Sequence, residues 1–107
     1  MLICQWHLDI VYGKQAEAVR IMRAWGADKF AHSEFRRAHG ARLLAGLVGA
    51  SAAHLVDEYS FDSLGDFEIA LASMATPQFR RHSDALAPYI VPGSQRWVVY
   101  RVLEEGS

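Results

Sequence analysis

The sequence has little cysteine, little proline and almost no net charge. Cys4 is the only cysteine among 107 residues, so no disulfide can form within the chain, and nothing indicates an oxidising compartment. A formal net charge of −1 creates no field that would attract nucleic acid or an anionic membrane. These absences predict a cytoplasmic protein whose partners include neither nucleic acid nor a membrane.

Long apolar runs are also missing. The longest uncharged run, residues 43–56, contains Gly46 and Gly49 and is shorter than the roughly 20 residues of a membrane-spanning helix. The apolar start of the chain is followed at once by Gln5, His7 and Asp9, which is not the pattern of a secretory signal. We expect one globular domain over residues 1–107, because this length supports a single hydrophobic core.

Motifs that bind cofactors or metals are the third absence. The chain has no G-x-G-x-x-G, no phosphate-binding loop and no G-x-S-x-G nucleophile motif. None of its 5 histidines has a partner at H-x-x-x-H spacing, and no cysteine cluster assists them. The sequence predicts no cofactor and no metal site. A haem held by a single histidine is the alternative, which the visible spectrum of the pure protein would reveal.

What is present is a regular order of strands and helices. Apolar residues at every second position of residues 2–11 indicate a strand with one apolar and one mixed face. Ser63 and Asp66 have the spacing of a capping box and open a helix, which Thr76 and Pro77 restart. The expected strands are residues 2–11, 42–48, 54–61 and 95–103; the expected helices are residues 14–27, with a resumption over 30–37, and two segments between 63 and 90.

The order β-α-β-β-α-β predicts an α+β, ferredoxin-like fold, with one four-stranded antiparallel sheet and two helical segments on one face. The other face of the sheet must be covered. Whichever alternate set of strand residues faces the helices, apolar residues such as Ile3, Val56 or Trp97 remain on the other face. We expect a homodimer in which two sheets face each other as a dimeric α+β barrel. RNA-recognition domains share this order, but residues 54–61 carry two carboxylates and neither arginine nor lysine, which argues against RNA binding.

Several segments resemble the dimeric α+β barrel superfamily. They are residues 58–64 (EYSFDSL), the helix after them with Ala70 and Leu71, residues 76–79 (TPQF) and residues 97–102 (WVVYRV). They are similar to the second halves of NIPSNAP-like and antibiotic-biosynthesis-monooxygenase-like members. Monooxygenase-like members often carry a histidine in the helix before the Thr-Pro-like break. This chain has LASMA there, at residues 71–75.

The resemblance implies a range of activities, because the superfamily includes cofactor-free oxygenases of polycyclic aromatic molecules, isomerases, cyclases, haem enzymes and proteins without known activity. The leading hypothesis is a homodimer that binds an apolar, aromatic or polyketide-like small molecule in its barrel. Its reaction would be a cofactor-free oxygenation (monooxygenase), isomerisation or cyclisation. The alternative is a non-catalytic dimerisation or ligand-sensing module, whose barrel would be filled by side chains.

Candidate catalytic residues gather on the first strand. Gln5, His7 and Asp9 share one of its faces, where His7 could act as acid or base. Asp9, two residues away, or Glu58 of the third strand could orient the imidazole. The same face could equally be wet or hold hydrogen bonds that stabilise a dimer, and Glu58 could form a structural salt bridge to Arg101.

Candidate substrate-binding residues are more dispersed. Gln5 and Arg101 would position polar groups of the substrate. Trp25 and His32, where the first helix ends, would form the mouth of a pocket, although an aromatic residue at helical spacing is also typical of a core. His54 flanks a turn, where we expect an exposed side chain.

Overall fold

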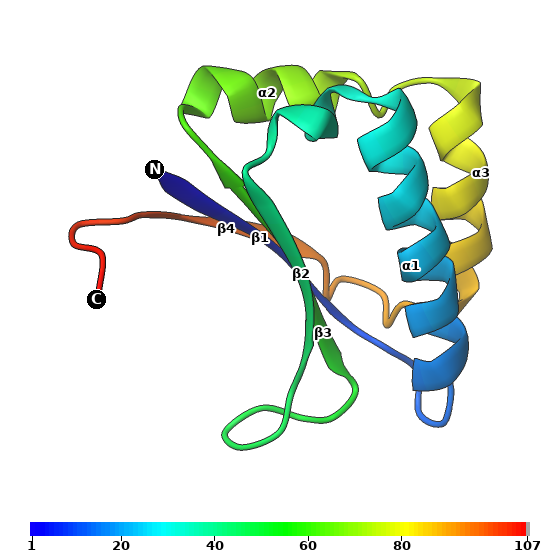
Figure 1. Ribbon diagram of the computed structural model, residues 1–107. Helices are drawn as coiled ribbons and strands as arrows, with labels where there is room; N and C mark the ends of the chain where they lie inside the picture. The colour runs from blue at the N-terminus through cyan, green and yellow to red at the C-terminus, as the bar shows by residue number, and fades with distance from the viewer. Residues whose placement is uncertain (107) are drawn as a thin grey trace.

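The computed structural model describes residues 1–106 and has the predicted order of elements (Figure 1). Strands β1 and β3 are the longest and lie at the centre of the sheet. A short 3₁₀ turn follows the first helix, and another follows the last. The elements are β1 (Leu2–Asp9), α1 (Gln15–His32), η1 (Glu34–Arg37), β2 (Gly40–Ala45), β3 (His54–Phe61), α2 (Leu64–Ala72), α3 (Pro77–Leu86), η2 (Ala87–Tyr89) and β4 (Arg96–Arg101).

The strands form one 4-stranded antiparallel sheet in the order β2-β3-β1-β4. In Figure 1 the α-helices lie on the same side of this sheet, with α1 and α3 side by side, and the other side is bare. This is the arrangement expected for two βαβ halves that share one sheet. The predicted ferredoxin-like α+β fold class is confirmed.

The alternation of β1 decides which face the helices cover. Cys4, Trp6 and Leu8 point toward the helices and are 0%, 9% and 0% exposed. Gln5 and His7, between them, point to the bare face and are partly exposed. Burial raises the pKa of the Cys4 thiol to about 11, which fits an inert thiol in an apolar strand.

Local signals in the second half start the helices where predicted. The Ser63 hydroxyl accepts a hydrogen bond from the Asp66 amide at 3.2 Å and caps α2. Pro77 lies at the start of α3, where the N–H that it lacks would have no helical partner. The helical region predicted between residues 63 and 90 is therefore divided at Thr76, and the short turn η2 ends it.

Several element boundaries differ from the predicted ones. Strand β1 ends at Asp9 rather than at residue 11, and β4 covers Arg96–Arg101 rather than residues 95–103. Helix α1 continues through Gly26 instead of ending near residue 27, because Trp25 and Lys29 both bury their side chains. That burial outweighs the helix cost of one glycine, about 1 kcal/mol. Strand β2 covers Gly40–Ala45 rather than residues 42–48.

The core lies between the sheet and the helices. One cluster of buried side chains centres on Trp6, Leu8 and Trp25, and the other on Tyr59 and Phe61. Among residues 1–106, no such layer lies above the bare face. No helix within residues 1–106 combines the length and the apolar character that a membrane span requires.

Candidate functional site

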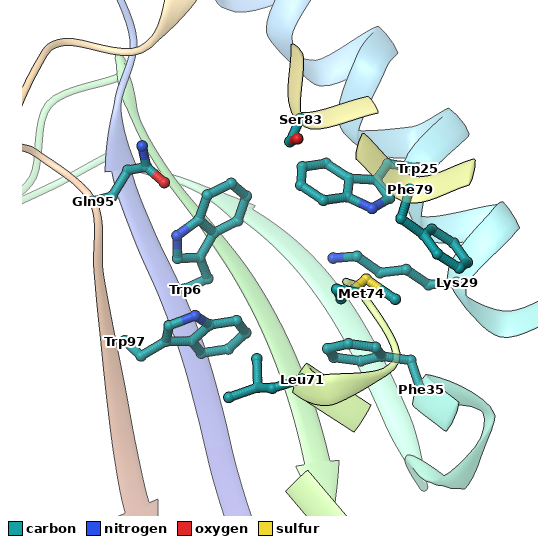
Figure 2. Close-up of a pocket in the computed structure, with 10 residues that line it drawn as sticks. All are labelled: Trp6, Trp25, Lys29, Phe35, Leu71, Met74, Phe79, Ser83, Gln95 and Trp97. Carbon is teal, nitrogen blue, oxygen red and sulfur yellow. The ribbon is translucent and has the colours of Figure 1, made fainter. Parts of the chain in front are cut away.

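A cavity of about 280 Å³ lies between the sheet and the helices (Figure 2). Trp6 and Trp97 line it from strands β1 and β4, while Trp25 and Phe79 line it from helices α1 and α3. The chain contains 3 tryptophans, so every one of them borders this space, which we call the aromatic cavity. Its other lining residues are Lys29, Phe35, Leu71, Met74, Ser83 and Gln95.

Contacts between the rings shape the aromatic cavity. Trp6 and Trp97 stack with their centroids 6.4 Å apart and an interplanar angle of 25°. Trp25 stands nearly perpendicular to Trp6, at 5.6 Å and 77°. Ring faces on one side and ring edges on the other provide the surroundings that planar apolar molecules prefer.

Lys29 places an ammonium group in the wall of this cavity. The residue is 3% exposed, and its Nζ donates hydrogen bonds to Asp57 Oδ2 at 3.0 Å and to the Tyr59 hydroxyl at 3.2 Å. The same Nζ lies 4.5 Å from the centroid of the Trp25 ring and 5.0 Å from that of Phe35, within the range of cation–π attraction. Figure 2 shows the Lys29 side chain extending between these two rings.

Burial determines the electrostatics around Lys29. It lowers the pKa of the Lys29 ammonium, and the Asp57 carboxylate offsets only part of this effect. Burial, followed by the charge of Asp57, raises the pKa of Tyr59. The Tyr59 hydroxyl therefore stays protonated and donates to Asp57 at 2.9 Å. Asp57 and Tyr59 do not line the aromatic cavity, so its wall presents the cation without the counter-ion.

Trp25 contributes a second unusual donor. Within residues 1–106, its Nε1 is the only buried side-chain nitrogen or oxygen without a hydrogen-bond partner. The residue is 9% exposed, and its ring stacks on His82 at 6.0 Å. A buried donor without a partner costs about 1–3 kcal/mol, and an acceptor atom of a bound molecule would remove that cost. Trp25 belongs to the buried core cluster, as is typical of an aromatic residue at helical spacing, and it also borders the aromatic cavity; its role in substrate binding stays a prediction.

A continuous chain of hydrogen bonds crosses the bare face of the sheet. Asp9 Oδ1 lies 2.7 Å from His54 Nδ1, and His54 Nε2 lies 2.8 Å from His7 Nδ1. His7 Nε2 lies 2.9 Å from Gln5 Oε1, and Gln5 Nε2 donates to Glu58 Oε1 at 2.8 Å. We call these five residues the open-face chain.

Strand register assembles the open-face chain from β1 and β3. Asp9 lies opposite His54, and Gln5 lies opposite Glu58. His7 sits between the two pairs on β1 and reaches diagonally to His54, a distance that long side chains can span across an antiparallel pair. No group of three or more His, Cys, Asp and Glu side chains within residues 1–106 is placed to hold a metal ion.

Glu58 ends the chain as a buried carboxylate. It is 4% exposed, and Arg42 donates from Nε to its Oε2 at 2.6 Å. Burial raises the pKa of Glu58, but the hydrogen bonds from Arg42 and Gln5 outweigh that effect, so the pKa lies below its usual value. The predicted alternative of a salt bridge between Glu58 and Arg101 is wrong. Arg101 lies opposite Leu2, so its side chain is on the face of the sheet that the helices cover, whereas Glu58 is on the other face.

The structure also corrects the expected partner of Asp9. Asp9 bonds to His54 rather than to His7. The expectation of an exposed turn residue at His54 is wrong, since its side chain is 19% exposed and it begins β3. The alternation of β3 already puts His54 on the same face as Glu58, and this signal could have identified it.

The predicted site residues thus fall into two groups on opposite sides of the sheet. Trp25 lies at the aromatic cavity, whereas Gln5, His7, Asp9 and Glu58 form the open-face chain with His54. Successive strand residues point to opposite faces, so the two groups cannot contact the same small molecule within one chain. His32 joins neither: its side chain is 62% exposed and borders a hollow between the end of α1 and the start of α3.

Comparison with known proteins gives structural matches. No protein-family model and no curated protein matches this chain. An uncharacterised NIPSNAP domain protein from Burkholderia xenovorans matches with a TM-score of 0.72 and 20% identity, over 95% of this chain and 94% of that one. An antibiotic-biosynthesis-monooxygenase-like protein from Nitrosomonas europaea matches with a TM-score of 0.68 and 15% identity, over 97% and 100%.

A variant of SnoaB, a cofactor-independent oxygenase from Streptomyces nogalater, matches with a TM-score of 0.69 and 18% identity, over 97% of this chain and 95% of that one. The chain shares its ferredoxin-like α+β fold with these proteins. The resemblance predicted from residues 58–64, 76–79 and 97–102 is thereby confirmed for the fold. A shared fold does not imply a shared reaction, because the side chains of this ferredoxin-like domain determine its function.

Proposed function

We propose that this protein binds a planar aromatic small molecule carrying an anionic oxygen in the aromatic cavity. The observation that supports this best is the combination of tryptophan rings, the Lys29 ammonium and the unpaired Trp25 N–H in one cavity wall. Rings provide contact area for an aromatic skeleton. A buried cation and a free N–H donor favour a phenolate or enolate oxygen over a neutral one.

The proposed reaction is a cofactor-free oxygenation, isomerisation or cyclisation of that molecule. Each of these can proceed through a substrate oxyanion, which the Lys29 ammonium would stabilise from the cavity wall. In an oxygenation, the substrate anion itself supplies electrons to dioxygen. SnoaB, which shares the fold, is a cofactor-independent oxygenase.

Binding can be tested with alizarin, a planar hydroxyanthraquinone that ionises near neutral pH, and with the neutral anthraquinone. Because all tryptophans border the cavity, both molecules should quench the intrinsic fluorescence saturably. In the double variant Lys29→Met with Asp57→Asn, alizarin should bind about 10- to 100-fold more weakly, because a hydrogen bond to a charged group contributes about 1.5–3 kcal/mol. Anthraquinone should bind as before.

The double variant includes Asp57→Asn so that Lys29→Met does not leave an unpaired buried carboxylate, and the neutral anthraquinone serves as the control. An absence of quenching by both molecules would contradict the proposed binding. Product analysis by mass spectrometry, with and without dioxygen, tests turnover of the bound molecule separately. Binding without any new product in either atmosphere would instead identify a ligand-sensing module.

We also propose that two copies pair through the bare faces of their sheets. Tyr100 lies opposite Ile3, and Val98 lies opposite Gln5, so these apolar side chains share the face of the open-face chain. Tyr100 is 55% exposed in the single chain. Apolar side chains gathered on an uncovered face are typical of an interface, and a second copy offers the same surface.

Analytical ultracentrifugation tests this pairing with matched variants of neighbouring residues. The unmodified protein should sediment as a dimer, and Val98→Glu should sediment as a monomer, because the new carboxylate would be buried without a partner. Val99→Glu is the control. Val99 is 39% exposed and lies opposite Cys4, so it is on the face of the sheet that does not take part in the proposed pairing. A monomeric unmodified protein, or a Val98→Glu dimer, would contradict the pairing.

A further inference from the structure

The open-face chain connects two groups that only accept hydrogen bonds. It begins at the Asp9 carboxylate, whose side chain is 51% exposed, and ends at the buried Glu58 carboxylate. Arg42 on β2 donates to Glu58, which keeps that end ionised. The three side chains between the ends, from His54, His7 and Gln5, must therefore supply every hydrogen in the chain.

The orientation of Gln5 follows from this constraint. An ionised carboxylate cannot donate, so the Gln5 amide turns its NH₂ group toward Glu58 Oε1 and its carbonyl oxygen toward His7 Nε2. His7 Nε2 must then carry a hydrogen to bond at 2.9 Å. At the other end, His54 Nδ1 must carry a hydrogen to donate to Asp9 Oδ1.

The remaining link is the one between the two imidazoles. A neutral imidazole carries a hydrogen on only one of its nitrogens. With both rings neutral, His7 Nδ1 and His54 Nε2 would face each other as two lone pairs at 2.8 Å. The chain has four links, and neutral side chains place only three hydrogens in them.

We propose that His7 and His54 hold one shared proton between Nδ1 and Nε2, as an imidazole–imidazolium pair that forms an acid–base site on the open face. One added proton fills the link between the imidazoles, so that each of the four links then contains one hydrogen. The positive charge of the pair lies between the Asp9 and Glu58 carboxylates. Moving the proton across the 2.8 Å link exchanges the charge between the rings. The Asp9 side chain, 51% exposed in the single chain, would connect the pair to solvent, or to the space between the two sheets of a dimer. The inference concerns the opposite face from the aromatic cavity and does not depend on the function proposed there.

A second proton does not fit the same geometry. It would turn the imidazole link into two facing N–H groups. Burial, followed by the charges of His54 and of Arg96, lowers the pKa of His7; for the first proton the four hydrogen-bonded links offset this cost, whereas a second proton finds no acceptor in the chain. Arg96 of β4 lies opposite His7, and Arg42 is already paired with Glu58. The pair should therefore hold one proton over a broad range of pH and take up the second only in acid.

Long-range ¹H–¹⁵N NMR of the imidazole nitrogens, recorded from acid to alkaline pH, measures the proton count directly. At pH 7 the His7–His54 pair should carry one proton shared between its rings, and it should titrate as a coupled pair. The exposed His32 provides a reference signal in the same spectra. Two neutral rings at pH 7 would overturn the proposal.

Two variants test the hydrogen count itself. Gln5→Leu removes the acceptor that requires a hydrogen on His7 Nε2, so neutral rings can then satisfy both remaining links. Asp9→Asn supplies the missing hydrogen from its own amide. Each should lower the proton affinity of the pair about tenfold or more, whereas Arg96→Gln keeps every link and should not lower it. If Gln5→Leu leaves the titration unchanged while the folded spectrum is retained, the shared proton does not arise from the chain and the proposal fails.

Discussion

Replacing Asp57 with alanine should lower the free energy of unfolding by about 3–5 kcal/mol. The Lys29 ammonium would lose its counter-ion at 3.0 Å and would remain in a site where the residue is 3% exposed. A buried charge without a partner is poorly solvated, and the Tyr59 hydroxyl alone does not neutralise it. Urea unfolding followed by far-UV circular dichroism measures the loss, with the slope of the transition checking that both proteins unfold alike.

Two comparisons isolate the buried charge as the cause. The triple variant Lys29→Met, Asp57→Leu and Tyr59→Phe removes all polar groups of the cluster and should be close to the unmodified protein in stability, since no group is left unsatisfied. Glu17→Ala breaks an exposed ion pair with Arg20 and should have no measurable effect. An Asp57→Ala variant as stable as Glu17→Ala would contradict the burial of the Lys29–Asp57 pair.

Filling the aromatic cavity should abolish ligand binding without unfolding the protein. Met74 borders the cavity and is only partly buried, so the larger indole of Met74→Trp can enter the space of about 280 Å³. We expect alizarin and anthraquinone to lose at least tenfold in affinity, equivalent to about 1.4 kcal/mol. The free energy of unfolding should stay level or rise, because filling a void adds contacts. Titration calorimetry and urea unfolding measure the two quantities.

Ile69→Trp is the matched control for this substitution. Ile69 belongs to α2, is 45% exposed and does not line the cavity, so the same change there should leave binding intact. Undiminished binding in Met74→Trp would show that the ligand occupies another site. Loss of binding in both variants would also contradict the assignment to this cavity.

The order of elements was predictable because local signals agreed with one another. The alternation of β1, the Ser63 cap of α2 and Pro77 at the start of α3 each act within a few residues. Such local signals can be recognised in the sequence without knowledge of the tertiary structure. The end of α1 was not predictable, because Gly26 locally favours a break, whereas the burial of Trp25 and Lys29 in the tertiary structure favours a continuous helix.

The candidate sites show the same division. Periodicity placed Gln5, His7 and Asp9 on one face of β1, and the structure has them in one chain of hydrogen bonds. The inclusion of His54 depends on the register of β1 against β3, and this register cannot be predicted from the residues of either strand alone. The proton count of that chain follows from four distances between side chains far apart in the sequence.

The sequence by itself determined the fold class, because strand alternation, helix caps and chain order are properties of neighbouring residues. It also placed Trp25 among the candidate pocket residues. Only the tertiary structure decided that the tryptophans converge on one cavity with Lys29, whose counter-ion comes from β3. It alone separated that cavity from the histidine pair on the other face. Both outcomes depend on which strands pair and in which register, and pairing energies act between residues that the chain itself keeps apart.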